Sequence, residues 1–298
     1  MRIETVSVFP HMFDEVMSTS IIGRARACGA LEFVAHDLRD WTHDRHRSTD
    51  DVPYGGGPGQ LMKVEPVFEA LDELLGETRE PGETRELRKS GEPGESRKPR
   101  GELTKGELTK GELAKRPEHP QNAKVLFFTP HGQRFDQALA QALATESWLI
   151  MVCGRYEGFD ERVYTRADLC ISLGDYILTG GELAAMVVSD AICRLLPGVL
   201  GDASSNVDES FSQGLLEYPQ YTRPASYRGL TVPEVLLNGN HAAQAAWRRK
   251  MSIINTARTR PDLLSGAVLT PAERRLAELA RNPDAAAQAE LATELLGQ

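Results

Sequence analysis

Residues 1–198 alternate between short apolar runs and longer stretches in which apolar positions recur every three or four residues. Short runs rich in Val, Ile, Leu and Phe are typical of strands buried on both faces, whereas the longer period is typical of helices. Strand patterns cover Arg2–Phe9, Leu31–Leu38, Lys124–Thr129, Trp148–Gly154 and Asp168–Gly174. Helix patterns cover Val64–Leu75, Phe135–Glu146 and Gly180–Leu196. This alternation predicts an α/β fold with an open parallel sheet.

One segment of this region has a different composition. Residues 77–121 contain the repeats GELTK, GELTK and GELAK, mix charges of both signs and hold no aromatic residue. Such a segment cannot bury enough apolar area to offset its ordering entropy, so we expect a disordered insertion. The alternative is a nucleic-acid tether made of its lysines and arginines.

Residues 199–229 also interrupt the alternation. They are rich in turn-forming residues and are broken by Pro219 and Pro224, which predicts a flexible linker between two domains. Residues 1–198 would form the α/β domain. Helical spacing returns in residues 230–298 and predicts a small, all-helical second domain with a turn at Asn238–Asn240 and a frayed last helix.

Composition and charge narrow the class of protein. The chain has 298 residues, of which 41% are hydrophobic and 26% charged, as in ordinary globular proteins. No apolar run approaches the roughly 18–20 residues that cross a bilayer, and the start MRIETVSVFP lacks the layout of a secretory signal. The four cysteines are scattered without metal-ligand spacing. We therefore expect a reduced, cytoplasmic protein without a membrane segment. The net charge of −9 argues mildly against indiscriminate nucleic-acid binding but allows a local basic patch.

The densest polar stretch is HDRHRSTDDVPYGGGPGQLM at residues 43–62. Its four glycines between residues 55 and 59 allow positive φ and close approach of the backbone to a ligand. Gln60 follows where a phosphate-binding P-loop would need lysine, so that motif is excluded. A tight structural turn and a binding loop both remain open. A polar ligand such as RNA is favoured by the flanking Arg45, His46, Arg47 and Asp50.

Three predicted strands end in loops that combine glycine with polar residues. Their sequences are FFTPHGQRFD at 127–136, CGRYEGFDERV at 153–163 and SLGDYILTGGELAAM at 172–186. Ligands bind beyond the carboxyl ends of the strands in open α/β sheets. In the middle loop, Arg155 and Glu157 have a plainer interpretation as a surface ion pair worth under about 1 kcal/mol. Together the three loops predict a small-molecule site built partly from backbone groups.

Five motifs closely resemble the bacterial tRNA (guanine-N1)-methyltransferases, which belong to the knotted (SPOUT-type) methyltransferases. In chain order they are HDRHRSTDDVPYGGGPG, CGRYEGFDER, GDYILTGGELAAM, RLLPGVLG and LLEYPQYTRP. The resemblance implies a parallel sheet with a deep C-terminal trefoil knot, a rare exception to the rule that chains do not thread themselves. It also implies a homodimer with its active site between subunits, S-adenosylmethionine as methyl donor and a requirement for Mg²⁺. The implied reaction methylates N1 of the tRNA guanosine at position 37, just 3′ of the anticodon.

The resemblance also assigns residues to roles. The knot loops would hold S-adenosylmethionine on Phe128, Thr129, Pro130, Gly132, Gly154, Arg155, Tyr156, Glu157, Gly158, Leu173, Gly174, Asp175, Tyr176, Ile177, Leu178, Gly180 and Gly181. The guanine pocket would be shaped by His46, Asp50, Tyr54, Gly55, Gly56, Gly57, Pro58 and Gly59. Phosphates of the tRNA would meet Arg223, Arg228, Arg248, Arg249 and Lys250. The linker would become ordered when tRNA binds, and no residues are assigned to the metal.

The implied reaction needs a base and a cation. Guanine N1 carries a proton at neutral pH, so a carboxylate must remove it as the new bond forms. Charge left on guanine O6 would be stabilised by a cation, a role that the resemblance gives to Arg194. The base corresponds to an acid just before Ser-Phe in the linker, an aspartate in many family members. Here VDESF places Glu209 at that position and Asp208 one residue earlier.

Two questions stay open at this point. An ungapped alignment favours Glu209 as the base, whereas a shift of one residue would bring Asp208 into the same place. Two other functions are compatible with the motifs, namely methyl transfer to a different RNA and RNA binding without catalysis.

Overall fold

The computed structural model describes residues 1–76, 123–200, 209–211, 214–282 and 284–296. The predicted repeat insertion and Asp208 lie outside these residues. The chain divides into two compact units, Met1–Arg194 and Leu195–Gln298. Among the described residues, no helix has both the length and the apolar character needed to cross a membrane.

The first unit is built on a parallel sheet. Its five strands run in the order β2-β1-β6-β5-β7. Their bounds are β1 (Arg2–Ser7), β2 (Glu32–Asp37), β5 (Ala123–Arg134), β6 (Trp148–Val152) and β7 (Leu169–Ser172). Along β6 every residue is buried, as expected for a central strand covered on both faces. The structure therefore confirms the predicted α/β fold with a parallel sheet.

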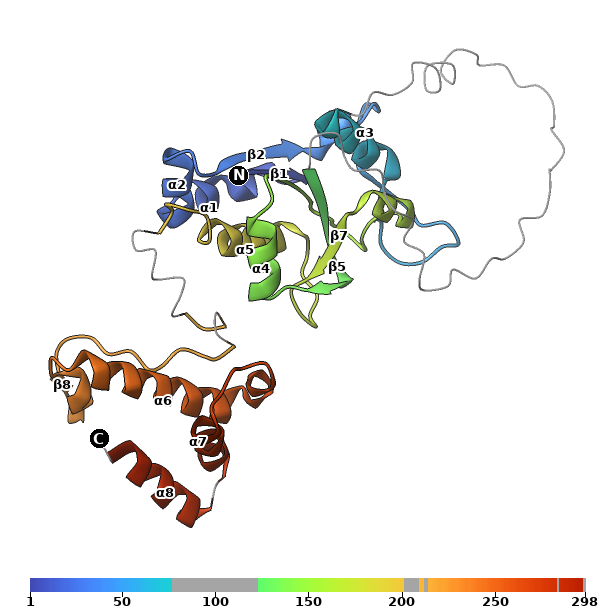
Figure 1. Ribbon diagram of the computed structural model, residues 1–298. Helices are drawn as coiled ribbons and strands as arrows, with labels where there is room; N and C mark the ends of the chain where they lie inside the picture. Colours follow the sequence, from blue (N-terminus) through green and yellow to red (C-terminus); the bar gives the residue numbers. More distant parts are fainter. Residues whose placement is uncertain (77–122, 201–208, 212–213, 283, 297–298) are drawn as a thin grey trace, which may run out of the picture. The chain divides into compact units, whose positions relative to one another are not determined.

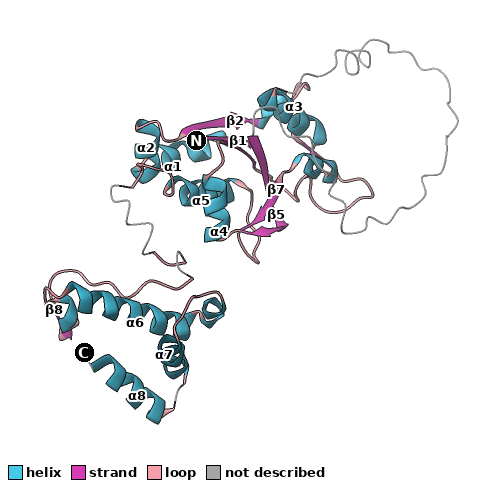
Figure 2. Ribbon diagram, viewed as in Figure 1, coloured by secondary structure: helices cyan, strands magenta, loops and turns pink. Residues whose placement is uncertain are grey.

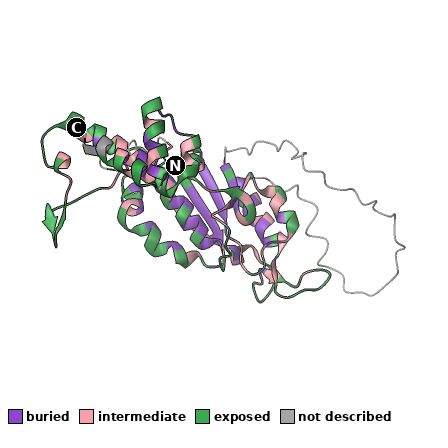
Figure 3. Ribbon diagram, turned by 90° about the horizontal axis from the view of Figure 1, so that it is seen from below, coloured by how far each residue is buried: buried purple, intermediate pink, exposed green. Residues whose placement is uncertain are grey.

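Helices cover both faces of the sheet (Figure 1). One face packs against α3 (Val64–Leu75), whose buried Val67 and Leu71 join Val6 and Ile150 in one apolar cluster. The opposite face carries four α-helices and a short 3-10 helix. They are η1 (Pro10–Phe13), α1 (Asp14–Ser18), α2 (Ser20–Ala27), α4 (Gln137–Ala144) and α5 (Glu182–Cys193). Two further 3-10 helices are η2 (Leu38–Trp41) and η4 (Glu161–Arg166). Buried residues concentrate in the strands and on the inner sides of the helices (Figure 3).

The helix predictions hold: α3 has its predicted bounds, and α4 and α5 are each shorter by two or three residues at either end. The sequence pattern did not predict α1 and α2. These two helices are short, and the polar run Ser18-Thr19-Ser20 separates them, so neither presents enough turns for an apolar period to stand out.

The second unit is mainly helical. Its elements are β8 (Ser226–Tyr227), β9 (Leu230–Thr231), η6 (Glu234–Leu236), α6 (His241–Thr259), η7 (Pro261–Ser265), α7 (Pro271–Arg281) and α8 (Ala285–Leu296). Asn240 caps α6 by accepting a hydrogen bond from the Ala243 N–H, in agreement with the predicted turn. The expectation of an all-helical unit missed the antiparallel hairpin β8–β9 (Figure 2). Its two-residue strands are too short to give an alternating pattern.

The cysteines are all free thiols. Cys153 and Cys193 are buried. Burial, with the charge of Asp190 as a smaller cause, raises the pKa of Cys193 to about 11. Both residues therefore behave as small hydrophobic side chains.

Candidate active site

The carboxyl ends of β5, β6 and β7 open into one cavity of 410 Å³. That volume lies within the roughly 300–1,000 Å³ typical of small-molecule sites. Of the residues assigned to the methyl donor, all except Gly132 and Asp175 line the cavity. The structure thus brings together three loops that are separate in sequence, at the edge where ligands bind in open α/β sheets.

Several lining residues were not predicted. They are His131, Phe159, Tyr164, Ile171, Ser172, Thr179 and Ala184. Phe159 and Tyr164 pack edge-to-face with ring centroids 6.0 Å apart and form part of the wall between the cavity and the sheet core. Their aromatic character within the FDERVY stretch was the available sequence signal, but it is equally typical of a purely structural core.

Gly132 and Asp175, the two predicted donor-site residues that do not line the cavity, lie elsewhere in the first unit. Gly132 lies within an irregularity of β5, between Phe128 and Gln133, which both pair with Ile171 of β7. A Cβ atom at Gly132 would lie 2.5 Å from the Ile171 backbone, so this glycine is required for packing between the strands. Asp175 is exposed.

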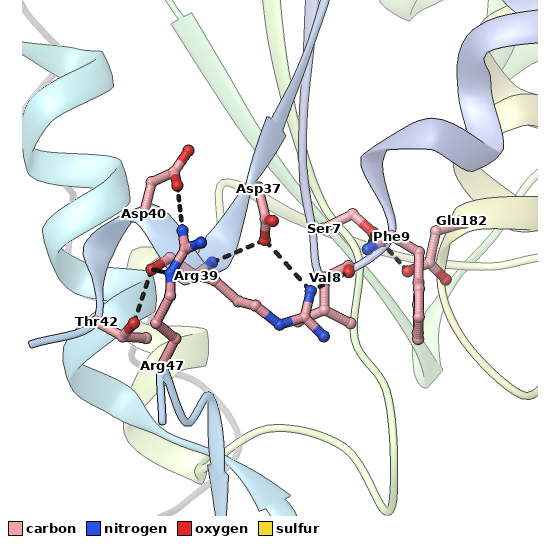
Figure 4. A network of polar contacts seen from close by, with 9 residues as sticks. All are labelled: Ser7, Val8, Phe9, Asp37, Arg39, Asp40, Thr42, Arg47 and Glu182. Carbon is pink, nitrogen blue, oxygen red and sulfur yellow. Dashed lines mark hydrogen bonds and ion pairs between the residues drawn. The ribbon is translucent and has the colours of Figure 1, made fainter. Parts of the chain in front are cut away.

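A buried carboxylate supports the cavity from behind. Glu182, the first residue of α5, is fully buried and accepts a hydrogen bond of 2.6 Å from the Ser7 hydroxyl at the end of β1 (Figure 4). The Nε atom of Arg155 lies 2.9 Å from Glu182 Oε2. The alignment of this contact falls short of a hydrogen bond, so we count it as an ion pair. These contacts join the end of β1, the loop after β6 and the start of α5.

Arg155 also ties two of the cavity loops to each other. Its guanidinium donates to the Thr179 carbonyl at 3.3 Å and stacks over the Phe9 ring, 4.6 Å from the centroid. The plainer interpretation of Arg155 as one half of a surface pair with Glu157 is therefore wrong, because its ionic partner is Glu182. Sequence reasoning missed Glu182, since an acid in the first turn of a helix is common for reasons unrelated to burial.

The glycine loop docks against the loop after β6. The short strands β3 (Asp50–Asp51) and β4 (Leu61–Met62) pair and bracket the glycines. The Met62 N–H donates to the Gly158 carbonyl at 2.8 Å, and the Glu157 N–H donates to the Gln60 carbonyl at 3.0 Å. The candidate guanine pocket and the candidate donor loops are therefore neighbours within one unit.

The residues of the glycine loop itself stay open to solvent. Tyr54 is fully exposed, and Gly55 to Gly59 and His46 are exposed as well. Burial, aided by a hydrogen bond from Tyr156 to Asp50, raises the pKa of Tyr156 above its ordinary value. Asp50 thus faces Tyr156 in the loop after β6, while the backbone of the glycine loop is open to solvent.

Figure 4 shows how the segment before the glycine loop is anchored. Arg47 donates to the Arg39 carbonyl at 3.2 Å and pairs with Asp40. The Arg39 guanidinium in turn donates to the Val8 carbonyl and contacts Asp37. Arg47 thus has a structural role, because its guanidinium holds the polar segment against η2, which Arg39 joins to the end of β1.

The residues predicted for proton removal and charge stabilisation belong to different units. Arg194 ends the first unit as the C-terminal cap of α5 and is half-buried. Glu209 belongs to the second unit and is also half-buried. Asp208 lies outside the described residues, and Arg223 is exposed.

The arginines of the second unit that were predicted to meet tRNA phosphates differ in the contacts they already make within the protein. Arg249 donates to Glu273 at 2.8 Å and to the Val268 carbonyl at 2.9 Å, so it holds α6 to the start of α7. The guanidinium of Arg248 stacks on Tyr218. Arg228 is exposed on the β8–β9 turn and available to a phosphate.

Among the described residues, no group of three or more His, Cys, Asp or Glu side chains is gathered as the ligands of a metal ion would be.

Comparison with known proteins agrees with this architecture. The family model described as tRNA (guanine-1)-methyltransferase TrmD matches residues 1–86 and 100–266. A tRNA (guanine-N(1)-)-methyltransferase of Syntrophotalea carbinolica is 45% identical over 97% of this chain and 100% of its own length. Proteins of the same name from Moorella thermoacetica and Heliobacterium modesticaldum are 45% and 46% identical, over 93% and 90% of this chain and 96% and 86% of their own. The chain therefore belongs to the TrmD family of tRNA (guanine-N1)-methyltransferases.

Proposed function

We propose that the protein transfers a methyl group from S-adenosylmethionine to N1 of the guanosine at position 37 of tRNA. Family membership over nearly the whole chain carries this proposal. The cavity at the ends of β5, β6 and β7 supports it, because it has the size and the backbone-rich lining that a nucleoside-bearing donor needs. With tRNA as substrate, the proposed activity is cytoplasmic.

The donor supplies an electrophilic methyl carbon whose bond to sulfur breaks as guanine N1 attacks. Our proposal for this chain is that Glu209, or Asp208 beside it, accepts the N1 proton during the attack. Arg194 stabilises the electrons that accumulate on guanine O6. The loops after β5, β6 and β7 would hold the donor, with Tyr176, Ile177 and Leu178 covering its apolar parts. The loop Tyr54–Gly59 would receive the guanine.

We further propose that the protein is a homodimer with a trefoil knot in the first unit. The exposed apolar side chains on the helical face support a partner there. Met12 and Val16, near the N-terminus, and Leu183 and Val187 on α5 are all between 39% and 50% exposed. A second copy of the chain would remove this apolar area from water. The Mg²⁺ requirement stays a prediction from the family.

The proposed function is tested by methyl transfer to tRNA transcripts that carry either guanosine or adenosine at position 37. We expect transfer only to the guanosine transcript and binding of S-adenosylmethionine in a calorimeter. Transfer to other RNAs in preference to this transcript would support the broader RNA methyltransferase. Binding of RNA without donor binding or transfer would support a catalytically silent relative.

A pair of glycine variants tests whether the glycine loop and the donor loop act together. Gly56 and Gly59 both have φ near +80° (78° and 83°), so alanine at either position costs roughly 1–2 kcal/mol of strain. A Cβ atom at position 59 would lie 2.3 Å from the Cγ atom of Glu157 and would collide with it. A Cβ atom at position 56 would enter open space. Gly59→Ala should therefore lower turnover about tenfold further than Gly56→Ala, because small displacements of positioning groups are costly. Equal turnover in the two variants would contradict this coupling.

A further inference from the structure

Two hydrogen bonds join described residues of the loop that follows Glu209. The Phe211 N–H donates to the Leu215 carbonyl at 2.7 Å, and the Glu217 N–H donates to the Ser210 hydroxyl at 3.0 Å. Ser210 is the residue directly after Glu209. The two bonds therefore fix the backbone next to the candidate base relative to Leu215 and Glu217.

This loop is fastened to α6 at adjacent positions. The Leu216 N–H donates to the Thr256 hydroxyl at 2.8 Å, and the Asn255 side-chain amide donates to the Glu217 carbonyl at 3.0 Å. Leu215 is buried in the apolar core of the second unit, beside Ile253 and other residues of α6 and α7. An apolar anchor and two hydrogen bonds thus hold one short stretch of backbone.

The attachment continues along the helix. Tyr218 lies under the guanidinium of Arg248, 5.1 Å from its ring centroid, and Tyr221 packs against Trp247 with centroids 6.4 Å apart. The stretch from Leu215 to Tyr221 therefore runs antiparallel to α6. This described part of the predicted linker belongs to the second unit and is not a free tether.

Thr256 is the central residue of the attachment. Its side chain is fully buried, and its hydroxyl accepts from Leu216 while donating to the Ser252 carbonyl at 2.7 Å. Ser252 lies within α6, where its carbonyl also accepts the helical N–H four residues further on, so loss of the hydroxyl would leave mainly the Leu216 N–H without a partner. A partly buried N–H without a partner is unfavourable, so the loop would detach or shift.

We propose that Thr256, with Asn255, is a positioning residue that places the linker carboxylate for proton removal; this inference rests on the proposed function. A base must come within hydrogen-bond reach of the guanine N1 proton, which requires a defined backbone at Glu209. Helix α6 holds this backbone in place through its hydrogen bonds with Leu216 and Glu217. The unit expected to hold the anticodon stem would then also carry the base.

The test compares Thr256→Val with Thr259→Val in the full-length protein. Thr259 lies one turn further along α6, is exposed and makes the same local bond, to the Asn255 carbonyl at 2.7 Å, but does not touch the loop. We expect Thr256→Val to lower the single-turnover rate of methyl transfer about tenfold at saturating tRNA and donor. Affinities for tRNA and S-adenosylmethionine should stay unchanged, and Thr256→Ser should restore the rate. Thr259→Val should behave as the wild type.

A second readout does not depend on catalysis. Hydrogen exchange at the Leu216 amide should quicken about tenfold in Thr256→Val and remain slow in Thr256→Ser. Asn255→Ala removes the other tie without altering the buried Thr256, and it should lower the rate in the same way. The Asn255→Ala variant keeps the proposal testable if Thr256→Val fails to fold.

Combination with replacement of the linker acid that proves to be the base, Glu209→Gln or Asp208→Asn, separates this inference from the proposed function. If Thr256 acts through that acid, Thr256→Val should add little to the loss caused by replacing the acid. A full additional loss in the double variant would overturn the inference, and so would a wild-type rate in Thr256→Val with a freely exchanging Leu216 amide. Absence of methyl transfer by the wild-type protein would instead contradict the proposed function.

Discussion

Replacement of Glu209 with glutamine is expected to lower the single-turnover rate of methyl transfer by about 10²–10⁴, the usual contribution of a general base. Glutamine keeps the size of the side chain and can still form hydrogen bonds, but it cannot accept the guanine N1 proton. The affinity for S-adenosylmethionine should not change, because the donor cavity is formed by residues of the first unit. Rapid-quench kinetics with the guanosine transcript and calorimetry with the donor measure the two quantities.

Asp208→Asn is the matched control for this experiment, since the two acids are adjacent in sequence. If the ungapped alignment is right, Asp208→Asn retains nearly the wild-type rate. A large loss at Asp208 and a small one at Glu209 would show that the aspartate is the base. Equal, mild losses in both variants would contradict the role of a linker carboxylate altogether.

The sheet could be predicted because its strands contain short runs of Val, Ile, Leu and Phe, and its central strands β1 and β6 are covered on both faces. Only β5 differed much from its prediction. The pattern ended at Thr129, whereas the strand returns after Pro130 and Gly132 to pair Gln133 with Ile171. A proline and a glycine are typical of the end of a strand, so only the neighbouring strand β7 could reveal that pairing resumes.

The meeting of three loops in one cavity followed from parallel topology alone, since all carboxyl ends of the strands lie at one edge. The contacts that support those loops could not be predicted from the topology. Ser7 and Glu182 are 175 positions apart in sequence and bond only because β1 and α5 pack together. Likewise, the turn-rich stretch after Glu209 resembled a linker, and its attachment depends on Thr256, which is 40 positions beyond Leu216. Local patterns carry no information about such contacts.

The ion pair between Arg155 and Glu182 illustrates how much such a support can matter. The Glu182 side chain is 1% exposed and that of Arg155 is 16% exposed. Removal of a charge from water is costly unless a counter-charge and hydrogen bonds replace the lost hydration. Glu182 has the Ser7 hydroxyl and the Arg155 cation for this purpose. Without Arg155, a buried carboxylate would face a single hydroxyl.

Arg155→Met should therefore lower the free energy of unfolding by about 3–5 kcal/mol, as measured by urea denaturation. Arg162→Met is the control, because Arg162 pairs with Asp160 at an exposed position, where the loss of an ion pair changes stability little. The double variant Arg155→Met/Glu182→Gln should recover most of the stability, since it removes the buried charge along with its partner. If Arg155→Met is as stable as Arg162→Met, the pair does not support the cavity. Arg155 also bonds to the Thr179 carbonyl, so the double variant should regain stability without regaining full affinity for the donor.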